Sequence, residues 1–152
     1  MRLLGFVAVA LLAVSPTSAW AETYGLVPPA GEAMAPLPTD AAVRDGMQTI
    51  RNLVRDNHTL VTHRRMPPDH AARFAKQVRV EADKILATSK VAGPGRDRLK
   101  ELLDQIVAGI DAVAKPPEGT LPVDGLVRAD EALARYPAEF DHPGWGEGSH
   151  SR

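Results

Sequence analysis

Cysteine is absent from this 152-residue chain, and aromatic residues make up only 5% of it. Without cysteine the chain can have no disulfide, no cysteine-bound zinc, no haem attached through thioethers and no lipid anchor of the bacterial lipoprotein kind. An apolar core must therefore hold the fold together, and a content of 44% hydrophobic residues can supply one. Because aromatic side chains are few, we expect this core to consist of Leu, Val, Ile and Ala, which suits the packing of helices.

Long hydrophobic runs are missing too. The most apolar stretch, residues 3–14, has 12 residues, whereas a membrane-spanning helix needs roughly 20. It follows the basic Arg2 and precedes small residues that end in Ala19-Trp20-Ala21. A positive start, a short apolar middle and an A-x-A ending are typical of a secretory signal peptide. We therefore predict that residues 1–21 are cleaved off, that the mature chain has no membrane span, and that it resides in the periplasm.

Neither sign of charge is in large excess. Only one of the 18 basic residues and none of the 19 acidic residues lies within residues 1–21, so the mature chain has a net charge of −2 with neutral His. Such a balanced surface has no broad positive field that would attract phosphate groups. We therefore expect no nucleic-acid partner.

Four segments of the mature chain repeat their apolar residues with the period of a helix. Breaks rich in Pro and Gly separate them, and Pro137 is expected to stop or kink the last one. We expect helices at about residues 39–63, 68–90, 96–115 and 123–136, the first capped by Thr39 or Asp40. Since each helix has only one apolar face and the linkers are short, the sequence predicts an all-α fold, an antiparallel up-down four-helix bundle.

The bundle domain is expected to occupy residues 39–145. Residues 22–38 are rich in Pro, Gly and Ala and have no sustained period, so we interpret them as a flexible leader. Residues 146–152 are interpreted as a disordered tail. Charged residues such as Arg44, Arg51 and Arg55 are expected on solvated helix faces.

Catalytic motifs are also lacking. The chain has no G-x-S-x-G sequence and no Gly-rich loop of the kind that holds phosphates. A di-iron bundle would need two Glu-x-x-His pairs within its helices, whereas the pairs with this spacing, Glu139–His142 and Glu147–His150, lie after Pro137. The sequence therefore predicts that the protein is not an enzyme.

One cluster of side chains suits a metal. His58, His63, Met66 and His70 fall within 13 residues, at the turn that joins the first two expected helices. Imidazole and thioether groups are suitable ligands for copper. However, His58 and His63 are five residues apart, or about 140° around a helix, so they share one ion only if the helix unwinds before Arg64. The alternative is that these are ordinary polar residues of an exposed turn.

A second pair suggests a cofactor. The segment DGMQTIRN, residues 45–52, resembles the first-helix pattern of the cytochrome b562-like four-helix bundles around their Met ligand. This resemblance covers about ten residues and the four-helix plan, and it implies a b-type haem held by Met47 and His142 and a role in electron transfer. The chain departs from the family because His142 lies between Pro137 and Pro143, where no regular helix would hold it inward. The alternative is that Met47 simply packs in the core.

The end of the chain shows another likeness. The segment RYPAEFDHPGW, residues 135–145, is similar to an ending seen in uncharacterised exported proteobacterial helical proteins, which implies no particular activity. Its aromatic residues Tyr136, Phe140 and Trp145 are spaced to cover the open end of a bundle, as a structural lid or as a binding surface.

These observations favour a non-enzymatic periplasmic helical bundle that acts as a binding or accessory protein for an unknown protein or small-molecule ligand. The alternative is a carrier of copper, at the four-residue cluster, or of b-type haem, between Met47 and His142.

Overall fold

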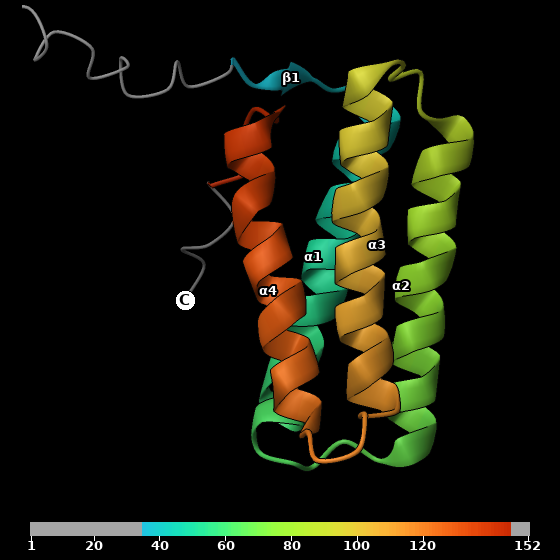
Figure 1. Cartoon of the computed structure of the whole chain (residues 1–152), viewed down its shortest axis with the longest axis vertical. Coiled ribbons are helices and arrows are strands. Elements are labelled where there is room, and N and C mark those ends of the chain that lie inside the picture. The colour runs from blue at the N-terminus through green and yellow to red at the C-terminus, as the bar shows by residue number, and fades with distance from the viewer. Residues whose placement is uncertain (1–34, 147–152) are drawn as a thin grey trace, which may run out of the picture. The chain divides into compact units, whose positions relative to one another are not determined.

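The computed structural model describes residues 35–146, and these form an antiparallel four-helix bundle, as predicted (Figure 1). The helices are α1 (Ala41–Thr62), α2 (Pro68–Thr88), α3 (Pro94–Ala114) and α4 (Pro122–Glu139). Each packs on its neighbours in chain order, and α4 closes the bundle against α1. The expected signal peptide, most of the expected leader and residues 147–152 lie outside the described residues. None of the helices in this part of the chain combines the length and apolarity that a membrane crossing requires.

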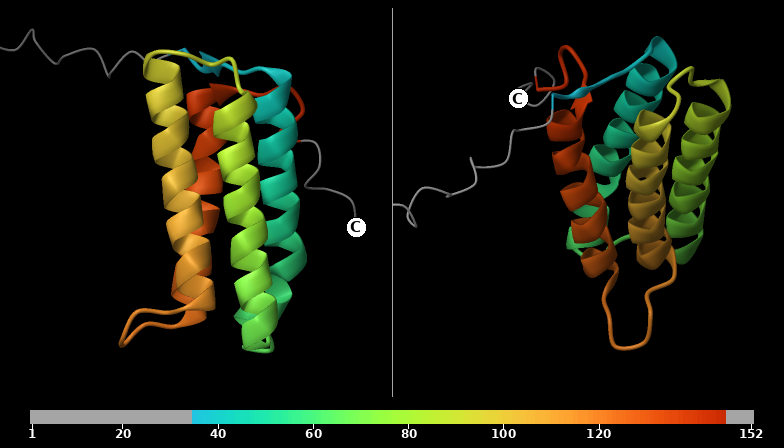
Figure 2. Two further views of the ribbon diagram at one scale, coloured as in Figure 1. Left: turned by 90° about the vertical axis from the view of Figure 1, so that its right-hand side faces the viewer. Right: turned by 45° about the horizontal axis from the view of Figure 1, so that its top comes forward.

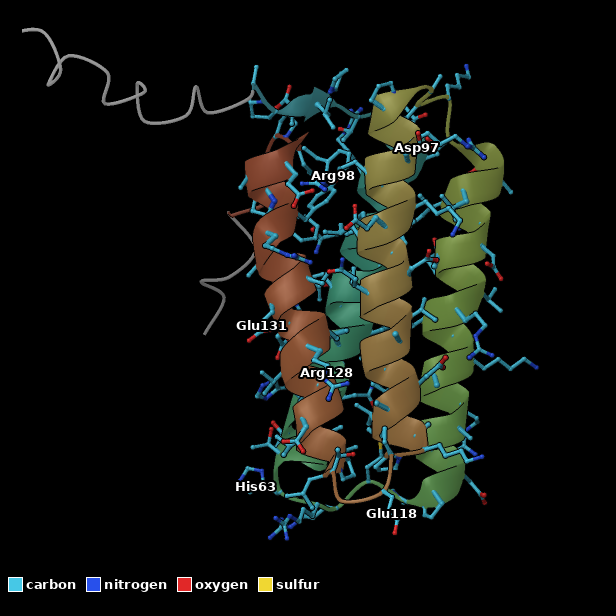
Figure 3. The ribbon with its side chains drawn as sticks, in the orientation of Figure 1. His63, Asp97, Arg98, Glu118, Arg128 and Glu131 are labelled. Carbon is cyan, nitrogen blue, oxygen red and sulfur yellow. The ribbon has the colours of Figure 1, made fainter. Side chains whose placement is uncertain are left out.

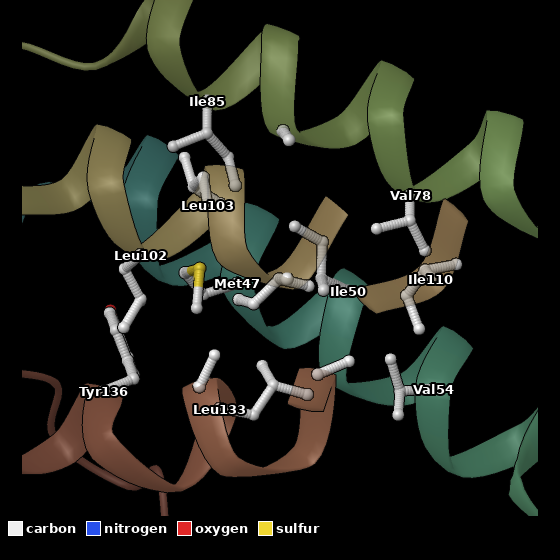
Figure 4. Packing of buried hydrophobic residues seen from close by; sticks show 14 of the residues in the cluster. Met47, Ile50, Val54, Val78, Ile85, Leu102, Leu103, Ile110, Leu133 and Tyr136 are labelled. Carbon is white, nitrogen blue, oxygen red and sulfur yellow. The ribbon is translucent and has the colours of Figure 1, made fainter. Parts of the chain in front are cut away.

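The apolar stripes of all four helices meet in one core (Figure 4). The stripe predicted for the first helix is buried at Val43, Met47, Ile50, Val54 and Val61. The largest fully buried side chains include Tyr136, Phe74 and Phe140, so the few aromatic residues of the domain are concentrated inside it. Removing these stripes from water is the main force that stabilises the bundle, because most of the stability of a helix in a protein comes from packing its apolar face.

Asp40 caps α1 and also ties it to the loop between α2 and α3. Its carboxylate accepts hydrogen bonds from the backbone N–H groups of Val43, at 2.9 Å, and of Lys90. The other three helices begin with a proline. Proline has no backbone N–H, and in the first turn of a helix this costs nothing, because an N–H there would have no partner within the helix. Burial by itself would raise the pKa of Asp40, but the two backbone hydrogen bonds, a hydrogen bond with Ser89 and the positive charge of Arg44 together hold this pKa below its usual value of 3.8.

We predict that Asp40→Ala lowers the free energy of unfolding by about 1 kcal/mol, the usual effect of losing a helix cap. Because the pKa of Asp40 is depressed in the folded state, this stabilisation is present above its unfolded pKa and is lost as the pH falls through the folded pKa. Urea unfolding should therefore show a difference between the wild-type chain and Asp40→Ala at pH 7 that shrinks below about pH 4. Asp40→Asn keeps a capping oxygen and should lose less. A difference that persists undiminished at pH 2 would contradict this account.

Helix α4 extends further than the sequence predicts. Pro137 was expected to stop or kink the helix after Tyr136, yet α4 continues to Glu139. Proline removes a single backbone N–H, and near the end of a helix few turns remain for it to disturb. The chain then leaves the helix at Phe140, whose N–H still donates to the carbonyl of Tyr136.

A two-residue parallel pairing, which the sequence does not predict, closes one end of the bundle. Strand β1 (Leu37–Pro38) pairs with β2 (Phe140–Asp141), and the Thr39 hydroxyl donates to the carbonyl of Asp141. Both strands lie at the end of the bundle where α4 terminates (Figures 1 and 2). The last two residues of the expected flexible leader are therefore ordered. Two residues are too few to show the alternation that marks a strand.

The packing of α4 is uneven. Gly109 and Gly125 let the backbones of α3 and α4 approach so closely that a Cβ on Gly125 would lie 2.5 Å from the carbonyl oxygen of Gly109. Of the neighbouring pairs, α3 and α4 are packed most closely, and α1 and α4 least closely. The small residues thus draw α4 onto α3 and leave the seam between α1 and α4 more open.

Candidate functional site

The surface between α1 and α4 has a hollow of about 490 Å³, which we call the α1/α4 groove. Its apolar lining comes from Val54 on α1 and from Leu133 and Ala134 on α4, and Trp145 lines it as well. Its ionisable lining consists of Arg51, Arg55 and His58 from α1 and Asp130 from α4. An apolar hollow of this size that also holds a few polar groups is typical of small-molecule sites, which span roughly 300–1,000 Å³.

Helical spacing places these side chains together. Arg51, Arg55 and His58 follow one another by four and three residues, so they share one face of α1. On α4, Asp130 precedes Leu133 and Ala134 by three and four residues and so lies on the same side. Since α1 and α4 are antiparallel neighbours, their two faces meet along the groove.

The segment after α4, residues 140–146, folds back against the bundle, and we call it the C-terminal strap. The Trp145 ring packs on the buried Tyr136 ring with centroids 4.6 Å apart. The guanidinium of Arg51 lies 4.9 Å from the centroid of the Trp145 ring and donates a hydrogen bond to the Trp145 carbonyl. Tyr136, Phe140 and Trp145 are all buried. The strap also fixes Arg51 at one end of the groove.

The charges of the groove influence one another. Nε2 of His58 lies 3.6 Å from Oδ2 of Asp130, and both side chains are about half exposed. Partial burial raises the pKa of Asp130, and a positive charge on His58 partly opposes this shift. Arg55 pairs with the neighbouring Asp56 at 3.2 Å, with both side chains more than half exposed. Exposed pairs of this kind contribute little stability, so Arg55 can readily exchange its partner.

Each of two larger hollows includes one pair of polar side chains that already bind each other. The hollow of about 680 Å³ between α2 and α3 includes the ion pair of Arg79 and Asp111. The hollow of about 600 Å³ between α3 and α4 includes Arg135, which donates a hydrogen bond to Gln105. Arg128 and Glu131, which extend from α4 in Figure 3, also line it. Among the described residues, neither hollow has an aromatic side chain in its lining. We therefore regard the α1/α4 groove as the candidate site despite its smaller volume.

The structure does not bring the predicted copper ligands together. His58 faces Asp130, and His63 donates from Nδ1 to the Thr59 carbonyl of its own helix at 2.9 Å. His70 donates from Nε2 to the side-chain amide oxygen of the buried Asn57 at 2.7 Å. The fourth residue, Met66, is partly buried against the core. Within residues 35–146, no three His, Asp or Glu side chains are grouped closely enough to hold a metal ion.

The physical reason is the length of α1, which remains helical to Thr62 and so directs His58 and His63 to different sides. His63 lies at the end of the bundle opposite β1, the same end as Glu118 of the α3–α4 loop (Figure 3). The copper hypothesis stays a prediction, without a ligand cluster in its support.

Met47 and His142, the predicted haem ligands, also have other roles. Met47 is fully buried among the core residues of the bundle (Figure 4). His142 lies against the rings of Tyr136 and Trp145, and its Nδ1 is 3.0 Å from the Tyr136 hydroxyl. Burial lowers the pKa of His142, and the positive charges of Arg44 and Arg51 lower it further, which favours the neutral imidazole. Neither residue lines any of five surface hollows found on residues 35–146. The haem hypothesis stays a prediction.

Sequence reasoning did not identify the groove, although it singled out several of its residues. It assigned Arg51 and Arg55 to a solvated face, His58 to a metal site and Trp145 to a lid. The spacing of Arg51, Arg55 and His58 by four and three residues was a visible signal for one functional face. The facing residue Asp130 lies 72 positions beyond His58, so no local pattern could connect the two.

Comparisons of this chain with protein-family models, with curated proteins and with solved structures give no match. The chemistry of the groove is therefore the basis on which its function is argued.

Proposed function

We propose that this chain is a non-enzymatic, periplasmic binding protein that holds a small-molecule ligand in the α1/α4 groove. The observation that carries this proposal is the convergence of four ionisable side chains and Trp145 on an apolar surface between the two least closely packed neighbouring helices. Polar groups at such a place can orient a ligand while the apolar surface supplies binding energy.

The residues of the groove favour binding over covalent catalysis. Within residues 35–146, none of its lining residues is a Ser, Thr or Cys that His58 could activate as a nucleophile. The imidazole of His58 faces the Asp130 carboxylate, which suits a charged binding surface. The basic start, apolar middle and A-x-A ending of residues 1–21 support placing this activity in the periplasm.

Ala134 allows a direct test, because it is an exposed residue of α4 that lines the groove. We predict that Ala134→Trp fills the hollow and displaces its ligand. The measurement is native mass spectrometry of the processed protein, purified from its own compartment. A bound small molecule is expected on the wild-type protein and to be absent from Ala134→Trp.

Ala138→Trp is the matched control, since Ala138 is equally exposed on α4 but is not a lining residue of the groove. This variant should retain the bound molecule. A wild-type protein that carries no small molecule, or an equal load on all three proteins, would overturn the proposed function.

A further inference from the structure

We infer that the ligand of the α1/α4 groove is a small organic anion with an apolar body. This inference rests on the proposed function and adds the chemical class of the ligand. It follows from the balance of charge in the groove, from the partners of each charged group, and from the size and apolar character of the surface.

Positive groups outnumber negative groups in the groove. Two guanidinium groups, on Arg51 and Arg55, and the imidazole of His58 line it, against the single carboxylate of Asp130. The next carboxylate, Asp56, pairs with Arg55 outside the lining. An anion therefore gains a net attraction whether His58 is neutral or charged, and protonation of His58 increases it.

The two arginines have different roles. Arg51 is held by the Trp145 ring and carbonyl, so it supplies a fixed positive charge at the strap end of the groove. In the part of the chain that the structure describes, Arg55 has only the exposed side chain of its neighbour Asp56 as a partner. Its guanidinium is therefore free to exchange this weak pair for two parallel hydrogen bonds to a carboxylate or sulfonate.

The rest of the groove indicates an apolar body. Val54, Leu133 and Ala134 offer no hydrogen-bonding side chain, and the volume of about 490 Å³ suits a molecule the size of one or two fused rings with substituents. An inorganic anion would leave this surface in contact with water. An amphiphilic organic anion would cover it and place its charge at Arg55.

Two substitutions that change the charge of the groove are expected to change anion affinity in opposite directions. Arg55→Gln removes a positive charge and should weaken anion binding. Asp130→Asn removes the only carboxylate of the lining and should strengthen anion binding. A binding site that recognises only apolar surface would respond to neither change.

Two fluorescent probes separate charge from apolar contact, because they share one aromatic body. Anilinonaphthalene sulfonate is an anion, and phenylnaphthylamine is its uncharged counterpart. Titration of the processed protein should show at least roughly ten-fold tighter binding of the sulfonate, the scale of about one strong charged contact. Binding of the sulfonate should also weaken as salt is added.

The variants are measured with the same sulfonate probe. We expect roughly three- to ten-fold weaker binding by Arg55→Gln and a similar strengthening by Asp130→Asn, as for one charge in a half-exposed site. Arg73→Gln removes an equally exposed arginine, on α2, that does not line the groove, and it should leave affinity unchanged. Ala134→Trp should abolish binding. Because Ala134 also lines the hollow between α3 and α4, this loss places the probe in the α1/α4 groove together with the responses to Arg55→Gln and Asp130→Asn, which line only the α1/α4 groove of the two. Circular dichroism verifies that each variant is folded.

The possible results separate this inference from the proposed function. If both probes bind equally and Ala134→Trp removes both, the surface around Ala134 is a binding site but the anion inference is wrong. If the sulfonate binds and Ala134→Trp does not affect it, the probe lies elsewhere and the inference is also overturned. If neither probe binds, the inference and the proposed function fail together.

Discussion

Gly125→Ala is expected to lower the free energy of unfolding by about 2 kcal/mol, although alanine is the better helix former. The added Cβ would lie 2.5 Å from the carbonyl oxygen of Gly109 and 2.8 Å from the backbone N of Val113. These are backbone atoms of the neighbouring helix, so no side chain can rotate away to make room. Overpacking of this kind typically destabilises by up to about 3 kcal/mol, while the helix propensity of alanine returns only about 1 kcal/mol.

Urea unfolding followed by circular dichroism measures this effect, and Gly95→Ala is the matched control. A Cβ on Gly95, which lies in the first turn of α3, meets only a methyl group of Val91, at 3.1 Å. Since that side chain can shift, we expect Gly95→Ala to change stability by no more than about 1 kcal/mol, in either direction. Equal stability of Gly125→Ala and Gly95→Ala would show that α3 and α4 are not in backbone contact.

Tyr136→Ala is expected to have the largest effect, a loss of about 4 kcal/mol in the free energy of unfolding. Tyr136 is fully buried, and its ring stacks on Phe140 with centroids 5.3 Å apart and packs on Trp145. Its removal leaves a cavity under the C-terminal strap and takes away the group that holds His142. The strap should then separate from the bundle, and Trp145 should become exposed to solvent.

Trp145 itself reports this change, because Trp20 is the only other tryptophan and lies in the predicted signal peptide. The fluorescence of the processed Tyr136→Ala protein should shift to longer wavelength before global unfolding. Tyr136→Phe keeps the ring and loses only the hydrogen bond to His142, so it should lose about 1 kcal/mol and keep the wild-type spectrum. If Tyr136→Ala also keeps that spectrum, the strap does not depend on Tyr136.

The candidate site was predictable in its parts but not in its assembly. Arg51, Arg55 and Trp145 all had visible features in the sequence, and each was given a separate interpretation. His58 was assigned to a cluster with His63 and His70 because the three are close in the chain. In the fold each of these imidazoles has a different partner, and the partner of His58 is Asp130 on the last helix.

The sequence by itself determined four helices, most of their bounds and the core. Three of the signals are local: the period of apolar residues, the capping carboxylate of Asp40 and the prolines at helix starts. Their effect depends on residues that are near in the chain and not on how the helices pack. Pro137 is the local signal that was outweighed, since α4 continues beyond it.

Only the tertiary structure decided which seam of the bundle is open and which residues face it. The approach of Gly109 to Gly125, the pairing of Leu37–Pro38 with Phe140–Asp141 and the contact of Arg51 with Trp145 join residues that are far apart in the chain. Such contacts depend on how whole helices pack, because the position of one helix sets the space left beside the next. A pattern within one helix carries no information about that space.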